Sequence, residues 1–164
     1  MSEKIRYNVF RKSALPKGER VYMKERVLFV CVQNTARSQM AEGILKSIAE
    51  DTFEVYSAGI TAGSELNPYA VAVMREIGID ISKNRVKSIE DLLKEEDDFE
   101  YVITVCDEGK AASCPVFPEA GTQHHWPLDD PGTFTGTEEE RLARTRVVRE
   151  ALRERIFEFL KQYA

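Results

Sequence analysis

The stretch VLFVCVQNTARSQMAEG, residues 27–43, decides the fold of this chain. It opens on an unbroken apolar run within residues 26–30, as expected for a strand that is buried on both faces of a sheet. Cys31 ends the run, a polar loop follows, and residues 38–50 carry apolar side chains at helical spacing. A buried strand that passes through a short loop into a helix is the repeating unit of a parallel α/β sheet.

The rest of the chain continues this alternation. We expect further strands at 53–59, 101–105 and 122–126, and helices at 38–50, 67–78, 87–96 and 137–163. Pro68 suits the first turn of its helix, Gly78 suits a C-cap, and Thr137 with Glu140 fits a capping box. The alternation predicts a single-domain α/β protein with an open, four-stranded parallel sheet and helices on both faces.

Composition narrows the classes of function. The 164 residues suffice for one domain, and 43% hydrophobic with 31% charged residues is ordinary for a globular protein. A net charge of -5 argues against general nucleic-acid binding, and no apolar run is long enough to span a membrane. The N-terminal segment lacks the apolar region of a secretory signal, so we expect a cytoplasmic protein. Residues 1–24 are expected to form an extension or arm, and residues 25–164 the compact domain.

Residues 31–37 have the composition of an anion-binding loop joined to a nucleophile. A loop after a buried strand can turn several backbone N–H groups inward, and the following helix adds unpaired N–H groups and its positive dipole end. Arg37 adds a planar fork for two oxygens of an oxyanion, and the same positive field favours a thiolate at Cys31. The expected oxyanion-binding residues are Val32, Gln33, Asn34, Thr35, Ala36 and Arg37. The alternative is a buried core cysteine beside a surface arginine.

The segment CVQNTARS resembles the C-x5-R-[ST] loop of low-molecular-weight protein tyrosine phosphatases. Together with VYSAGI and HHWPLDDP, the longer match CVQNTARSQMAEG is more similar to thioredoxin-coupled arsenate reductases, which share that fold. The resemblance covers residues 26–160. It implies that Cys31 is the nucleophile, Arg37 binds the oxyanion, Asn34 braces the loop and Ser38 donates a hydrogen bond to the thiolate.

The two other cysteines lie in VITVCDEGKAASCPVFP. Cys106 ends a second buried strand, so we expect it at the same edge of the sheet as Cys31. One interpretation is a metal site made by Cys106, Cys114, His124 and His125, although the spacing matches no usual zinc motif. Another is a pair of small structural hydrophobes. We expect neither a metal nor a cofactor.

The interpretation that we prefer is the one that the resemblance implies, a thiol relay that reduces arsenate to arsenite. Cys31 would attack arsenate, Cys106 would attack the sulfur of Cys31, and Cys114 would take over the disulfide. A thioredoxin-like dithiol protein would then reduce the Cys106–Cys114 disulfide. A phosphatase needs the first cysteine alone, so the second pair distinguishes the two activities.

The segment LDDP supplies the expected proton donor. In the resembling fold the aspartate directly before proline is the general acid, which implies that role for Asp130. Asp129 is expected to serve in a turn or a cap. His124 and His125 are expected to be structural residues of the last strand.

The chain departs from the pattern of the family at three points. Gln33 stands where glycine is common, which is tolerable if its side chain points outward or its backbone avoids positive φ. Seven residues separate Cys106 from Cys114, one more than expected. Some relatives hold potassium beneath the loop. The matching positions here are Asn34, Glu42, Ser57 and, in place of an aspartate, Lys87, so we predict that potassium is not required.

Two other functions remain open. A low-molecular-weight phosphotyrosine protein phosphatase would work through a phosphocysteine at Cys31, but the segment GTFTG after LDDP lacks the tyrosines usual in such enzymes. A redox sensor or anion-binding regulator could use the same three cysteines without catalysis.

Overall fold

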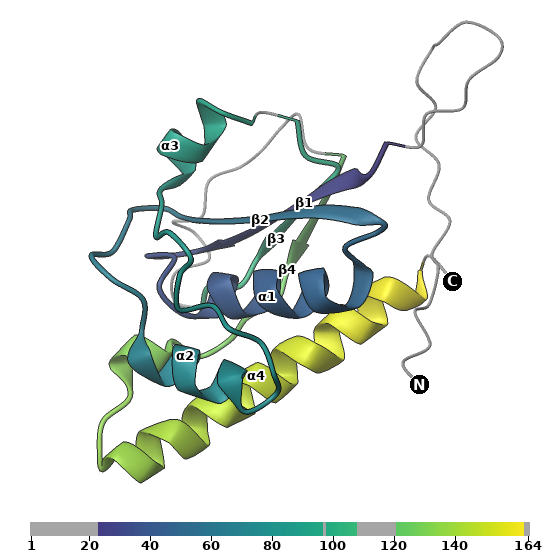
Figure 1. Ribbon diagram of the computed structural model, residues 1–164. Helices are drawn as coiled ribbons and strands as arrows, with labels where there is room; N and C mark the ends of the chain where they lie inside the picture. Colours follow the sequence, from purple (N-terminus) through teal and green to yellow (C-terminus); the bar gives the residue numbers. More distant parts are fainter. Residues whose placement is uncertain (1–22, 97, 108–120, 163–164) are drawn as a thin grey trace, which may run out of the picture.

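Four parallel strands form the sheet in this computed structural model, which describes residues 23–96, 98–107 and 121–162 (Figure 1). The strands are β1 (Glu25–Cys31), β2 (Phe53–Gly59), β3 (Tyr101–Thr104) and β4 (Thr122–His125), in the spatial order β2-β1-β3-β4. All three pairings are parallel, which confirms the predicted sheet. The expected N-terminal arm, but for its last two residues, and Cys114 lie outside the described residues.

Helices cover both faces of the sheet, as predicted (Figure 1). They are α1 (Arg37–Ala49), α2 (Pro68–Arg75), α3 (Ile89–Leu93) and α4 (Glu138–Lys161), with a short 3-10 turn η2 (Pro131–Thr133). The long helix α4 packs on α1 and α2 at one face, whereas α3 lies against the other. Within the part of the chain that the structure describes, no helix is both long and apolar enough to cross a membrane.

Caps explain where the helices begin. Asn67 caps α2 by accepting hydrogen bonds from the backbone N–H groups of Tyr69 and Ala70, so the helix starts one residue later than expected. Ser88 caps α3 by accepting a hydrogen bond from Asp91 N, so this five-residue helix starts two residues later than expected. Thr137 Oγ1 accepts a hydrogen bond of 3.1 Å from Glu140 N, one half of the predicted capping box.

The alternation of side chains along β1 divides the core into two layers. Val27, Phe29 and Cys31 belong to the larger cluster beneath α1 and α4. Leu28 and Val30 belong to the smaller cluster on the side of α3. Each fully buried aliphatic or aromatic side chain contributes about 1.5–3 kcal/mol to stability. This central strand therefore holds Cys31 rigidly at the carboxyl edge of the sheet.

Candidate active site

The loop of residues 32–36 is held from outside by the segment 60–67. Three of its carbonyl groups, and that of Cys31 directly before it, accept hydrogen bonds of 2.9–3.0 Å from the backbone N–H groups of that segment. The pairs are Cys31 with Ile60, Val32 with Thr61, Gln33 with Gly63 and Thr35 with Asn67. Because C=O and N–H point in opposite directions across a planar trans peptide, the N–H groups that follow these carbonyls face the inner side of the loop. That arrangement is a nest for an anion.

Two glycines make this close approach of backbones possible. A Cβ atom at Gly59 would lie 2.6 Å from the carbonyl carbon of Gln33, and one at Gly63 would lie 2.5 Å from Thr35 Cγ2. Neither glycine was singled out from the sequence, because nothing in the periodicity of β2 shows that its end packs against another loop.

Cys31 is buried, and its sulfur has two hydrogen-bonding neighbours. Asn34 N donates to Cys31 Sγ at 3.1 Å, and Ser38 Oγ lies 2.8 Å from the same sulfur. Ser38 Oγ also accepts from Asn34 Nδ2 at 2.8 Å, which leaves its own hydrogen available for the sulfur. Ala36, whose methyl group cannot cap, stands at the N-cap of α1, so the first N–H groups of that helix are left for an oxyanion.

Asn34 is the hub beneath the loop. It is fully buried and adopts a φ of 59°, a left-handed conformation that asparagine tolerates better than most residues. Its Oδ1 accepts from Lys87 N at 3.1 Å and from Gln39 Nε2 at 2.9 Å. Since a backbone N–H can only donate, the contact with Lys87 fixes the orientation of the amide. Gln39 was not singled out from the sequence, since a polar residue near a helix start is common.

The other side of the Asn34 amide continues into a polar chain. Its Nδ2 also donates to Ser57 Oγ at 3.0 Å, and Ser57 Oγ donates to Glu42 Oε2 at 2.6 Å. Glu42 in turn pairs with Lys46 at 2.7 Å. Burial lowers the pKa of Lys87, and the nearby Glu42 carboxylate partly opposes that shift. Among residues 23–96, 98–107 and 121–162, no group of three or more His, Cys, Asp or Glu side chains could hold a metal ion.

Gln33 meets both conditions under which a residue other than glycine is tolerable at this position. Its side chain is exposed, so it points away from the site. Among the described non-glycine residues, the one with positive φ is its neighbour Asn34. The departure from glycine at this position therefore leaves the loop intact.

The Arg37 guanidinium is almost fully buried and faces three oxygen atoms. Its Nη1 donates to the Leu128 carbonyl at 3.1 Å and lies 3.8 Å from Asp107 Oδ2, and its Nη2 lies 3.4 Å from Asp130 Oδ2. Asp130 Oδ1 accepts a hydrogen bond of 2.9 Å from Gly132 N and so caps η2. Of the turn or cap role expected for Asp129, the cap of η2 belongs to its neighbour Asp130, directly before Pro131.

Cys106 lies directly past the end of β3, beside the end of β1. Val105 N donates to the Val30 carbonyl at 2.8 Å, and Cys106 Sγ is 4.0 Å from the same oxygen. The side chain of Cys106 is fully buried. Cys31 thus ends β1 and Cys106 lies two residues after the end of the neighbouring strand β3, while Cys114 lies outside the described residues.

The two histidines of β4 make separate contacts. The His124 ring packs edge-on against Phe159, at a centroid distance of 6.0 Å, and is tilted against Trp126. His125 Nδ1 is 2.7 Å from Thr104 Oγ1. Adjacent residues of a strand point to opposite faces, which keeps these rings from acting together on one metal ion.

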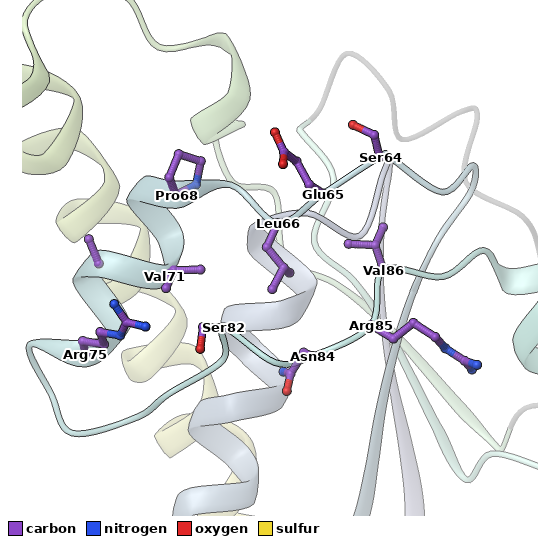
Figure 2. A pocket seen from close by; sticks show the side chains of 11 residues that line it. Ser64, Glu65, Leu66, Pro68, Val71, Arg75, Ser82, Asn84, Arg85 and Val86 are labelled. Carbon is purple, nitrogen blue, oxygen red and sulfur yellow. The ribbon is translucent and has the colours of Figure 1, made fainter.

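A cavity of about 640 Å³ lies between α2 and the segment 82–86 (Figure 2). Leu66 and Val71 form part of its wall, and the Arg85 side chain extends away from it. Its lining includes neither Cys31 nor Arg37. The cavity therefore lies apart from Cys31 and Arg37.

Known proteins agree with this geometry. The family model described as low molecular weight phosphotyrosine protein phosphatase matches residues 26–164, and the chain belongs to that family. It is 45% identical over 137 residues to an arsenate reductase of Bacillus licheniformis, which covers 83% of this chain and 95% of the relative. These findings confirm the resemblance predicted from the sequence.

Solved structures give the same fold. An arsenate reductase in the phosphate binding state has a TM-score of 0.70 at 31% identity, over 85% of this chain and 99% of the other. A thioredoxin-dependent arsenate reductase of Corynebacterium glutamicum has a TM-score of 0.60 at 27% identity, over 86% of this chain and 64% of the other.

Proposed function

We propose that this protein reduces arsenate to arsenite, with Cys31 as the nucleophile and a thioredoxin-like dithiol protein as the final reductant. The observation that carries the proposal is the position of Cys106 beside Cys31 at the carboxyl edge of the sheet. The names of the relatives support the substrate, and the thioredoxin-dependent neighbour supports the reductant.

In the first step the Cys31 thiolate attacks arsenic. The loop N–H groups and Arg37 hold the arsenate oxygens, and the Ser38 hydroxyl and Asn34 N–H stabilise the thiolate before attack. Asp130 gives a proton to the departing oxygen, which leaves as water, and a covalent bond joins sulfur to arsenic(V). General acid catalysis of this kind contributes about 10²–10⁴ in rate.

Reduction follows when the Cys106 thiolate attacks the Cys31 sulfur. The sulfur–arsenic bond breaks, its electron pair stays on arsenic, and arsenite leaves a Cys31–Cys106 disulfide. The Cys114 thiolate then attacks the Cys106 sulfur, which restores the Cys31 thiolate and forms a Cys106–Cys114 disulfide. The external dithiol returns both electrons to this disulfide and is itself oxidised.

A phosphotyrosine protein phosphatase is the second candidate, because the family description carries that activity. The loop would bind phosphate as well as arsenate, since both are tetrahedral oxyanions. Hydrolysis of a phosphocysteine would use Cys31, Arg37 and Asp130 and would leave Cys106 without a role in the reaction.

A pair of assays separates these functions. The first follows arsenate-dependent oxidation of NADPH through thioredoxin reductase and thioredoxin, and the second follows hydrolysis of an aryl phosphate. We expect the wild type to turn over in the first assay, and Cys106→Ser to lose that activity while keeping any aryl phosphatase activity. Efficient aryl phosphate hydrolysis without arsenate-dependent oxidation would support the phosphatase instead.

A further inference from the structure

The contact between Arg37 and Asp107 joins the anion loop to the second thiol. Asp107 directly follows Cys106, and its Oδ2 lies 3.8 Å from Arg37 Nη1. Only 2% of the Arg37 side chain is exposed, so water screens its charge poorly. The carboxylates of Asp107 and Asp130 are therefore its main counter-charges.

We propose that Asp107 is a competing anion, built into the chain, which an oxyanion displaces from Arg37. The displacement releases residues 106–107 from Arg37, so that the Cys106 thiol becomes available for reaction once substrate has bound. The inference rests on the arsenate reduction proposed above, in which Arg37 holds the oxyanion and Cys106 attacks second.

Of the two carboxylates beside Arg37, that of Asp107 is the one that an oxyanion can displace. Its side chain is 32% exposed, so its charge can turn to water at small cost. It also borders a cavity of about 280 Å³, together with Pro127, Leu128 and Asp129, which gives the carboxylate room to move. Asp130 is tied down by the hydrogen bond of 2.9 Å from Gly132 N.

The link to Cys106 follows from chain connectivity. Cys106 is fully buried and lies against the Val30 carbonyl, where an external oxidant or alkylating reagent has little access. In the proposal, the departure of Asp107 from Arg37 shifts the backbone of residues 106–107 as well as the Asp107 side chain, and this carries Cys106 out of its position. Because coupling between two equilibria is reciprocal, loss of Asp107 must favour the oxyanion as much as the oxyanion disfavours the Asp107 contact.

Phosphate binding tests the competition. The dissociation constant of inorganic phosphate is measured by calorimetry for the wild type and for Asp107→Asn. The control is Asp129→Asn, which removes an equal charge from the wall of the same cavity. We expect Asp107→Asn to bind phosphate about five-fold more tightly, as a partly exposed ion pair implies, and Asp129→Asn to change affinity less than about two-fold. Equal affinities in Asp107→Asn and the wild type would overturn the proposal.

Alkylation of Cys106 tests the coupling. The rate is followed on the peptide that contains Cys106, in a Cys31→Ser background that calorimetry has shown to bind phosphate. We expect saturating phosphate to accelerate labelling, and Asp107→Asn to label rapidly with or without phosphate. Labelling that phosphate slows or leaves unchanged contradicts the coupling. Neither measurement uses arsenate turnover. A negative result in either one would therefore overturn this inference and not the proposed reaction, which the coupled arsenate assay tests separately.

Discussion

Asn34 makes more hydrogen bonds within the site than its position in a loop suggests. Its side chain makes four hydrogen bonds, to Ser38, Ser57, Gln39 and the Lys87 backbone, and its own N–H reaches Cys31. Asn34 thus positions Cys31 and ties α1 to the segment that follows α2.

Replacing Asn34 with alanine should therefore cost stability as well as activity. Several buried partners would lose a hydrogen bond, and each unsatisfied buried group costs about 1–3 kcal/mol, so we expect a total loss of about 2–5 kcal/mol. Urea unfolding measures the difference. The matched control is Asn84→Ala at an exposed asparagine with one bond to Gln39, for which we expect less than about 1 kcal/mol. Equal losses in the two variants would contradict the role of Asn34 as the hub.

Lys87 gives a second prediction at the scale of the residue. Its ammonium group interacts with the Glu42 carboxylate beneath the loop, although burial lowers its pKa. We expect this charge to replace a potassium ion, so that the rate of arsenate reduction is the same in potassium and in sodium chloride at equal ionic strength. Several-fold activation by potassium would refute this expectation.

The contact of the anion loop with the end of β2 is a feature of two elements. The backbone hydrogen bonds between residues 31–35 and 60–67 require Gly59, because a Cβ atom there would meet the backbone of Gln33 at 2.6 Å and that of Thr61 at 2.6 Å. The anion loop cannot keep its shape if this segment moves away.

We therefore expect Gly59→Ala to weaken phosphate binding by about 10- to 100-fold, since small displacements of binding groups have effects of this size. Calorimetric titration with phosphate measures the change. Gly78→Ala is the control, because Gly78 has a φ of +79° with no described atom within 4 Å of an added Cβ. The control should lose about 1–2 kcal/mol of stability through backbone strain and keep its phosphate affinity. Unchanged affinity in Gly59→Ala would argue against the packing described here.

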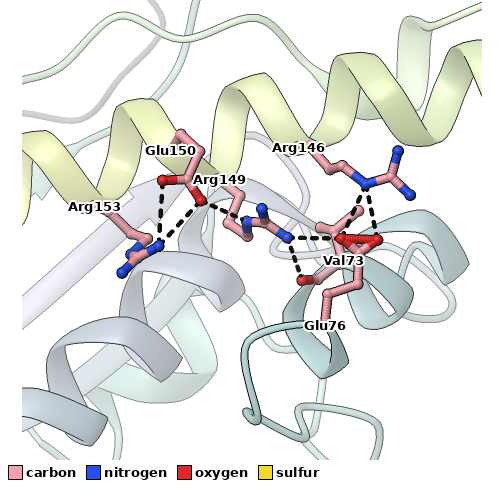
Figure 3. Close-up of polar contacts among 6 residues, drawn as sticks. All are labelled: Val73, Glu76, Arg146, Arg149, Glu150 and Arg153. Carbon is pink, nitrogen blue, oxygen red and sulfur yellow. Dashed lines mark hydrogen bonds and ion pairs between the residues drawn. The ribbon is translucent and has the colours of Figure 1, made fainter.

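An ionic network joins α2 to α4 (Figure 3). Arg146 Nε donates to both oxygens of Glu76 at 2.8 and 2.9 Å, and Arg149 Nη1 donates to Glu76 and to the Val73 carbonyl. The hydrogen bond from Arg146 is the main cause that lowers the pKa of Glu76 below its ordinary value of 4.5.

This shift sets the sign of a pH dependence. A carboxyl group whose pKa is lower in the folded than in the unfolded protein stabilises the fold at pH values above its unfolded-state pKa. That contribution is lost as the pH falls through its folded-state pKa. Glu76→Gln should therefore be less stable than the wild type at neutral pH, and the gap should close under acid conditions below pH 4.5. Urea unfolding over a pH series checks this, with Glu158→Gln, an exposed i,i+3 partner of Lys161, as the control. A gap that is constant with pH would contradict the ionic origin.

At the scale of the whole molecule, the sheet and its helices followed from local patterns. Apolar runs placed β1 and β3, and helical spacing placed α1 and α4, because burial on a regular element leaves its period in the sequence. The structure also places Ser38 beside Cys31 and Asp130 beside Arg37.

Other parts of the site had no such signal. Gly59 lies against the Gln33 backbone and Asp107 against Arg37, and both partners are far away in the sequence. The spacing of apolar residues along one element gives no sign of such contacts. The cap of η2 lies at Asp130, and the sequence could not assign it, because two adjacent aspartates before a proline look alike until the turn is built. The roles of Cys106 and Cys114 stay predictions.

The topology explains why one sheet edge can serve two thiols. Strands β1 and β3 are parallel neighbours, so their carboxyl ends lie side by side, and Cys31 and Cys106 lie at this edge although they are 75 positions apart in the chain. We propose this arrangement as the physical basis for a transfer of electrons from one thiol to the next.

A single-turnover experiment tests that claim most directly. Fully reduced protein is mixed with arsenate without any external reductant, arsenite is quantified, and the disulfide formed is mapped by mass spectrometry. We predict one arsenite per chain with a Cys106–Cys114 disulfide in the wild type, and a Cys31–Cys106 disulfide in Cys114→Ser. Arsenite formed at the wild-type level by Cys106→Ser, or arsenite without either disulfide, would contradict the account.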